Sequence, residues 1–431
     1  MDKKVFLNCN MFDGHAESVL VKCAVYVEKG VITKITENQN PSEGFEVIDL
    51  EGKYLMPGLV NPHIHLFGTG KPSKAISGGK TQERLMKLIK TSIGGKILDI
   101  LVKDAARQEL LSGVTTARTA GDFHYSDVRL RDKIKSGLAL GPRLVVSGPA
   151  ITVSGGHGDG TFALTADDNE GLKALVRKNK EAGVDYIKIC VTGGVIDAKV
   201  KGEPGELRMN LEQTKAVCEE AHRLGLRVAS HTESIKGVEI TAAAGVDTVE
   251  HGAALDEKTA AQMKASNSAM VVTYSPALPL MLLSPELTML DPICVYNTEI
   301  VVNNMTQGAK DCIENGILLG IGTDASCPFA TQYNMWREIV YLKKCVGVGN
   351  AYALSVATLG NAKVAGVDKL TGSIEEGKAA DMIITEENPL ENLHTLSRLH
   401  MVVYGGEVIY YPSPKKNAFI DTKLDEMMIT L

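Results

Sequence analysis

Eight short runs of β-branched and apolar residues alternate with helical stretches over residues 57–359. Several of these helical stretches end at glycine, the residue that most often terminates a helix. The runs lie at residues 58–65, 114–119, 143–148, 185–191, 226–231, 246–250, 269–274 and 317–323. Eight strands separated by helices is the count of a (β/α)8 barrel, which needs roughly 250 residues. We therefore predict an α/β protein with a TIM-like (β/α)8 barrel at residues 57–359.

The two ends of the chain lack this alternation. Residues 1–56 and 360–412 contain short β-type runs that are interrupted by Gly, Asn and Pro. The simplest arrangement pairs these regions in one small β-sandwich beside the barrel, so we assign residues 1–56 and 360–431 to a sandwich domain. The polar tail after Pro412 is expected to fray or to wrap around a neighbour.

Composition excludes several classes of protein. A net charge of -6 gives no reason to expect binding to nucleic acid or to an anionic membrane. No run approaches the roughly 20 apolar residues of a membrane span, and the N-terminus lacks the apolar core of a signal peptide. The eight cysteines form no C-x-x-C pair and are typical of reduced thiols. We expect a soluble, cytoplasmic protein that acts on a small molecule.

Six polar residues stand at or near the ends of five predicted strands. Since strand ends converge at the carboxyl-end mouth of a barrel, these residues are expected to meet there. They are His63, His65, Lys188, His231, His251 and Asp324. Histidines two apart on a strand share a face, and paired imidazoles suit a Zn²⁺-like ion. Each histidine alone could instead be a satisfied core residue, but the joint occurrence of all six favours a metal site.

Lys188 interrupts an apolar strand, where burial would strip its ammonium group of water at a large cost. One explanation is an ion pair with Asp324 or Glu250. The other is carboxylation of the neutral amine by CO₂, which creates an anion able to bridge two cations. Such a bridge would make a two-metal site with ions roughly 3.5–4 Å apart. Asp324 would then be a metal ligand and a base, unless it caps the next helix.

Together these residues resemble a known family. PGLVNPHIHL, Lys188 in the fourth strand, His231, VEHG and IGTD resemble the amidohydrolase superfamily of metal-dependent hydrolases. The segment GSIEEGKAADMII is similar to the sandwich of the same enzymes, and the resemblance implies the barrel-plus-sandwich fold over nearly the whole chain. GVTTARTAGD and SGGHGD are similar to the branch of imidazolonepropionase, prolidase-type dipeptidases and metal-dependent carboxypeptidases.

The resemblance also implies a division of the site. His63, His65 and Asp324 would hold one ion and His231 and His251 the other, with carboxylated Lys188 as the bridge and zinc as the default metal. His157, in SGGHGD, matches the position that polarises the scissile carbonyl, although a loop histidine can also cap a turn.

Lys188 discriminates within this branch, because mononuclear members lack a lysine at this strand. It favours a binuclear hydrolase that cleaves the C–N bond of a dipeptide, an N-acyl amino acid or a related linear amide. A metal-bridging hydroxide would attack the carbonyl, and Asp324 would pass the proton to the leaving nitrogen. The alternatives are a cyclic-amide hydrolase or deaminase on the same barrel, and a non-catalytic scaffold.

Three further residues are candidates for substrate binding. Glu233 stands two positions after His231, where dipeptidase-like relatives tend to have Tyr or His. Unless it points to solvent, its carboxylate would repel a substrate carboxylate and favour a cationic or amino-bearing substrate. Arg118 and Tyr274, at the ends of the second and seventh strands, would bind an anion or serve the fold.

Two long segments follow predicted strands and are expected to shape the site. Residues 68–95 are rich in Gly, Lys and Ser, which favours a mobile flap above it. Residues 276–296 are apolar and contain several prolines. They would line the pocket or form a contact between protomers, and the second outcome would make the protein a homo-oligomer.

Overall fold

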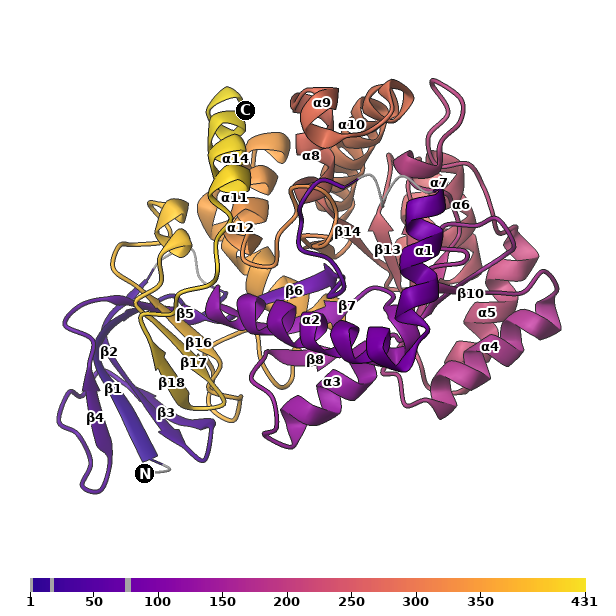
Figure 1. Ribbon diagram of the computed structural model, residues 1–431. Coiled ribbons are helices and arrows are strands. Elements are labelled where there is room, and N and C mark those ends of the chain that lie inside the picture. The colour runs from indigo at the N-terminus through magenta and orange to yellow at the C-terminus, as the bar shows by residue number, and fades with distance from the viewer. Residues whose placement is uncertain (1–2, 16–18, 74–78) are drawn as a thin grey trace.

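The computed structural model describes residues 3–15, 19–73 and 79–431. Figure 1 shows a sheet built from the two ends of the chain, in indigo and yellow, beside a larger body in which helices surround central strands. The larger body contains the residues of the predicted metal site.

The terminal sheet has eight strands in the order β18-β17-β16-β5-β1-β2-β3, with β4 also paired to β1 (Figure 1). Antiparallel pairing of β5 with β16 joins the two ends of the chain, in agreement with the predicted terminal β-sandwich. Apolar side chains from both ends, such as Phe6, Leu55 and Val403, form its core. The strands are β1 (Lys3–Met11), β2 (Leu20–Glu28), β3 (Val31–Thr36), β4 (Glu46–Asp49), β5 (Tyr54–Pro57), β16 (Met382–Thr385), β17 (Met401–Tyr404) and β18 (Glu407–Tyr410).

Two parallel sheets form the centre of the larger body. One has the order β6-β7-β8 and the other β10-β9-β11-β12-β13-β14-β15. Their strands are β6 (Leu59–Ile64), β7 (Val114–Thr119), β8 (Arg143–Val145), β9 (Ala150–Thr152), β10 (Ala163–Thr165), β11 (Ile187–Cys190), β12 (Val228–Thr232), β13 (Thr248–His251), β14 (Ala269–Val272) and β15 (Leu319–Ile321). All eight predicted runs therefore contain a parallel strand. Strands such as β6, β11 and β14 are buried along their whole length, which explains their largely apolar sequences.

The sheets meet without forming one continuous ladder among the described residues, so the predicted barrel is confirmed only in part. On one side, the ends of β6 and β15 are joined by two backbone hydrogen bonds. The amide of Asp324 donates to the carbonyl of His63 at 2.9 Å, and the amide of His65 donates to the carbonyl of Ala325 at 3.0 Å. The approach is close, since a Cβ on Gly322 would lie 2.5 Å from the Cβ of His63. On the other side, the amide of Asp185 donates to Val146 at 2.8 Å, after β8 has ended early.

Helices cover the outside of these sheets (Figure 1). The longer ones are α1 (Gly79–Ile89), α2 (Ser92–Leu111), α3 (Ser126–Lys135), α4 (Asn169–Glu181), α5 (Leu211–Arg223), α6 (Ile235–Ala244), α7 (Glu257–Ala265), α8 (Tyr274–Leu282), α10 (Pro292–Asn315), α11 (Met335–Val346) and α14 (Ala418–Thr430). Short ones are α9 (Pro285–Thr288), α12 (Asn350–Ser355), α13 (Asn361–Ala365), η1 (Phe123–Tyr125), η2 (Val195–Asp197), η3 (Val356–Gly360) and η4 (Leu393–Ser397). Within the described chain, no helix combines the length and the apolar character that crossing a membrane requires.

The tail after Pro412 does not fray, which corrects the expectation from its polar composition. Asn417 caps α14, whose Ile420, Leu424 and Met427 are buried. Nη1 of Arg337 in α11 lies 2.8 Å from Oδ1 of Asp425. The tail is ordered because these apolar side chains of α14 are buried against the protein, while Thr422, Asp425 and Glu426 remain exposed.

Candidate metal centre

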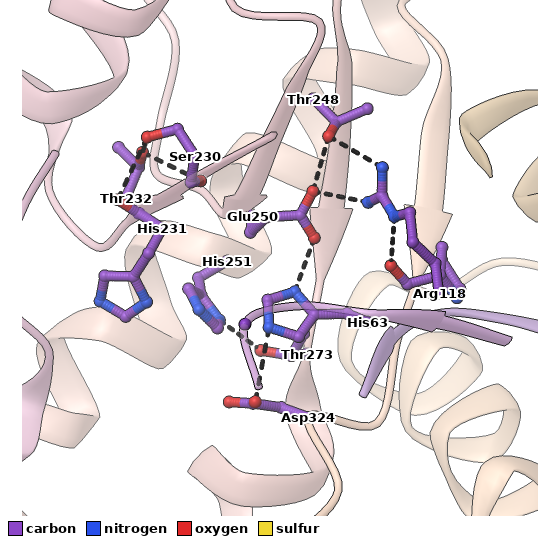
Figure 2. A network of polar contacts seen from close by, with 12 residues as sticks. His63, Arg118, Ser230, His231, Thr232, Thr248, Glu250, His251, Thr273 and Asp324 are labelled. Atoms are coloured by element: carbon purple, nitrogen blue, oxygen red, sulfur yellow. Dashed lines mark hydrogen bonds and ion pairs between the residues drawn. The ribbon is translucent and has the colours of Figure 1, made fainter. Parts of the chain in front are cut away.

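The parallel strands bring the six predicted metal-binding residues to one cavity of about 470 Å³. Four of them lie in β6, β11, β12 and β13, His65 directly follows β6, and Asp324 stands three residues after the end of β15. All six are buried. Figure 2 shows the side chains of His63, His231, His251 and Asp324 gathered at this place. The convergence that was expected of strand-end residues is therefore observed.

His63, His65 and Asp324 form what we call the first cluster. Oδ1 of Asp324 lies 3.4 Å from Nε2 of His63 and 3.2 Å from Nε2 of His65. Asp324 has a φ of +46°, a left-handed conformation that is unfavourable outside glycine and is often retained at functional sites. Burial alone would raise the pKa of Asp324, but the two imidazoles hold it well below its usual value.

The opposite nitrogens of these imidazoles are already engaged. Nδ1 of His63 donates to Oε2 of Glu250 at 2.6 Å, and Nδ1 of His65 donates to the carbonyl of Gly121 at 2.8 Å. A second proton on Nε2 would let each ring donate to Asp324. In the neutral ring the proton stays on Nδ1, and the lone pair on Nε2 faces a carboxylate oxygen. Acceptors that face each other in this way fit a cation between them, and the held Nδ1 is typical of a metal-binding histidine.

His231, Glu233 and His251 form the second cluster, in which three possible ligand atoms lie within 4.8 Å of one another. Nδ1 of His251 shares a hydrogen bond of 2.7 Å with Oγ1 of Thr273. Nε2 of His231 is buried and has no hydrogen-bond partner within the described chain. Burial lowers the pKa of both histidines well below the ordinary value, so both are neutral and able to bind a metal.

Lys188 lines the same cavity and is 2% exposed. Its Nζ atom has no hydrogen-bond partner among the residues that the structure describes. The ion pair with Asp324 or Glu250 that could have explained this lysine is therefore not formed. Burial lowers the pKa of the amine below its ordinary value, which favours the neutral form that reacts with CO₂.

Glu233 points into the cavity and not to solvent. Its Oε2 accepts a hydrogen bond of 2.8 Å from the amide of Val195, and its Oε1 lies 3.7 Å from Nε2 of His231. Burial raises the pKa of this carboxyl to about 8 in the absence of an ion. The structure thus places Glu233 where a substrate or a metal would meet it.

His157 also lines the cavity, and its ring stacks on that of His231 with centroids 4.2 Å apart. Its Nδ1 donates to Oδ2 of Asp197 in η2 at 2.5 Å. Burial alone would lower the pKa of His157, but the hydrogen bond and charge of Asp197 raise it above the ordinary value. His157 is therefore held against the site and does not cap a turn. Asp197 was not identified from the sequence.

Arg118 does not line the cavity, which favours the structural alternative over the substrate-binding role. Its Nη2 donates to Oε1 of Glu250 at 2.7 Å, its Nε donates to the carbonyl of Pro62 at 2.6 Å, and its Nη1 donates to Thr248 (Figure 2). Glu250 in turn holds His63. Arg118 therefore supports His63, a predicted metal ligand, through Glu250.

Tyr274 is also misplaced by the sequence prediction. β14 ends at Val272, so Tyr274 begins α8, where it is fully buried. Its hydroxyl lies 3.2 Å from Oγ1 of Thr306, and its amide donates to Glu338 at 2.6 Å. The side chain serves packing between helices. In contrast, Pro276 and Leu280 of the same apolar segment do line the cavity.

Comparisons with known proteins agree with this geometry. The sequence pattern of the Amidohydrolase family matches residues 54–409. The crystal structure of a candidate prolidase from Bifidobacterium longum is 36% identical and superposes with a TM-score of 0.86 over 99% of each chain. A Xaa-Pro dipeptidase with bound methionine in its active site is 28% identical, with a TM-score of 0.83 over 95% of this chain and 100% of that one.

A curated relative leads to the same family. The imidazolonepropionase of Treponema denticola is 25% identical over 394 residues, which cover 84% of each protein. The relatives thus include the prolidase and imidazolonepropionase members of the branch that the motifs resemble. The chain belongs to the amidohydrolase family.

Proposed function

We propose that this amidohydrolase is a binuclear metal-dependent enzyme that hydrolyses the C–N bond of a dipeptide, an N-acyl amino acid or a related linear amide. The observation that carries the proposal is Lys188, a buried amine without a partner in the described chain, in the same cavity as both histidine clusters. The 36% identical candidate prolidase supports this substrate class. We also propose that the two parallel sheets are a (β/α)8 barrel with a terminal sandwich domain.

The residues fit two divalent cations. His63, His65 and Asp324 would hold one, His231 and His251 the other, and carboxylated Lys188 would join them, with zinc as the default metal. When bound, two such ions polarise a carbonyl and lower the pKa of water. The fit rests on the facing acceptors of the first cluster and on the unpartnered atoms of His231 and Lys188.

The protein's own groups then divide the remaining work. The low pKa of Asp324 keeps its carboxylate ionised, so it can accept a proton from the attacking water and pass it to the leaving nitrogen. His157, held by Asp197, would donate a hydrogen bond to the developing oxyanion. The products are a carboxylic acid and an amine. Once an occupant of the second cluster ionises it, Glu233 would favour substrates with an amino group and repel those with a carboxylate at that position.

The first test combines metal analysis with a substrate screen. We expect two ions per chain and, after incubation with ¹³C-labelled bicarbonate, a carbamate signal in the NMR spectrum. Dipeptides, N-acyl amino acids and cyclic amides are then compared as substrates. One ion per chain with unmodified Lys188 would refute the binuclear proposal. Turnover of cyclic amides alone would favour the alternative of a cyclic-amide hydrolase.

The role of Glu233 is tested separately by Glu233→Gln. We expect this variant to lose the preference for amino-bearing amides over their N-acetylated forms while it still hydrolyses both. Equal preference in the variant and the wild type would show that the charge of Glu233 does not select the substrate.

A further inference from the structure

The helical hairpin of α1 and α2 presents apolar side chains to the cavity that contains the metal centre. Leu85 and Leu88 of α1 and Ile97 and Leu101 of α2 all line this cavity. Each of the four is 42% to 49% exposed. Several large aliphatic side chains left exposed together mark a binding surface, because isolated ones are common but clusters are not.

The spacing of these residues gives each helix one face toward the cavity. Leu85 and Leu88 are three positions apart and Ile97 and Leu101 are four apart, so each pair lies on one side of its helix. A different face of α2, with Val102 and Ala106, packs in the core. Val102 and Ala106 already hold α2 against the core, so the side chains that face the cavity are not needed to position this helix.

An aromatic surface continues from the hairpin to the metal centre. Phe67 stacks on Phe162 with ring centroids 6.0 Å apart, and both rings line the cavity. The Phe162 ring lies 5.5 Å from that of His157 and 5.4 Å from that of His65. We call Leu85, Leu88, Ile97, Leu101, Phe67 and Phe162 the apolar wall.

We propose that the apolar wall binds a bulky aliphatic or aromatic group attached to the scissile amide. The substrates would then be amides with a large apolar substituent, and small polar dipeptides would be poor substrates. This inference rests on the proposed function and names the substrate class of the same site. Large apolar groups bind such surfaces by leaving water, and a few polar groups then fix their orientation.

The occupant is a substrate group and not a second copy of the chain, because the wall faces the cavity of the metal ligands. Ile93 and Ile100 of α2, each 68% exposed, lie beside Ile97 on the same side of the helix but do not line the cavity. We call them the outward pair, and they test whether exposure alone, without a place in the cavity, binds an apolar group.

The outward pair supplies a matched control. We would compare the double variant Leu85→Gln, Leu101→Gln with Ile93→Gln, Ile100→Gln by titration with the neutral fluorescent probe N-phenylnaphthylamine. Each replaced leucine should weaken probe binding roughly tenfold, so the wall variant should lose about a hundredfold and the control almost nothing. Metal content, thermal unfolding and light scattering should be the same for both variants.

Hydrolysis is measured in parallel on aminoacyl-naphthylamides, N-naphthoyl amino acids and small dipeptides. In the wall variant, kcat/KM for the bulky amides should fall about as much as probe binding, with small dipeptides unaffected. Equal probe binding by both variants, or a change from oligomer to monomer in the wall variant alone, would overturn the inference. Wall-dependent probe binding without hydrolysis of any amide by the wild type would refute the proposed function and leave the apolar binding wall supported.

Discussion

In the first cluster, both imidazoles have Nδ1 bound to a fixed acceptor, and both Nε2 atoms face Asp324. In the second cluster, by contrast, Nε2 of His231 has no hydrogen-bond partner within the described chain, and neither has the nearby amine of Lys188. The first cluster is organised before any ion binds, because its supporting contacts lie outside the cavity. The second cluster has polar atoms that only an occupant can satisfy, so we expect it to bind its ion more weakly and to depend on Lys188.

The largest effect should follow from Lys188→Ala. Without the bridging group, the second cluster should lose its ion, and kcat should fall by about 10³-fold or more, since each metal contributes several kcal/mol. Metal analysis should then show about one ion per chain. Lys180→Ala, on the exposed side of α4, is the control and should keep both ions. Full activity of Lys188→Ala would rule out the bridge.

The next effect concerns His157, which lies against the second cluster. His157→Ala should lower kcat roughly 10²- to 10³-fold, because it removes a donor to the developing oxyanion. Asp197→Ala should cost less, and it should add nothing in the His157→Ala background if Asp197 acts only by holding His157. A double-mutant cycle on kcat measures the coupling between His157 and Asp197. Additive losses would instead mean that Asp197 supports the loop of η2.

A smaller effect on metal binding should follow when the support of the first cluster is removed. Arg118→Met leaves Glu250 as a buried charge without its cation and should lower the free energy of unfolding by about 3–5 kcal/mol. The weakened support of His63 should also reduce metal affinity at the first cluster roughly 10- to 100-fold. Chelator competition and thermal unfolding measure the two effects. Unchanged metal affinity in a destabilised variant would make the network structural only.

The sequence predicts the residues that converge on the cavity better than the residues that support them, and the reason is physical. Strand periodicity is a local property, so His63, His65 and Lys188 are recognisable from their own segments. Their meeting then follows from the fold, because the strand ends of a barrel converge at one face. The partner of His63 is Glu250, 187 positions away, and no local pattern links them. The sequence offers one indication of a buried role for Glu250, which is its position inside the apolar run VDTVEH.

Side-chain direction was the other limit. Arg118 and Tyr274 were candidates for the cavity because each stands at the end of a predicted strand, yet one contacts Glu250 and the other lies between helices. β14 ends two residues earlier than predicted, so Tyr274 belongs to α8. β7 has the predicted bounds, and the depth of Arg118 in the protein could not be inferred from that strand alone. The β9 and β10 strands were missed because each has three residues and neither lies within a longer apolar run, unlike the equally short β8 and β15.

The smallest effect is a pH dependence of stability in the metal-free protein, and it arises in the second cluster. Burial raises the pKa of Glu233 from an ordinary value of 4.5 to about 8. Below pH 4.5 the carboxyl is protonated in both the folded and unfolded states. Between pH 4.5 and 8 the unfolded state loses this proton first, so stability falls as pH rises.

The neutral side chain of Glu233→Gln cannot titrate, so it removes this contribution and leaves the opposite one from His231 and His251 in place. The difference between the wild-type and variant unfolding free energies should therefore decline by roughly 1–3 kcal/mol over this pH range and level off above it. Urea unfolding of metal-free protein at several pH values measures the difference. If the difference in unfolding free energy does not depend on pH, Glu233 is already ionised in the empty cluster. Its ionisation would then need no occupant of the second cluster.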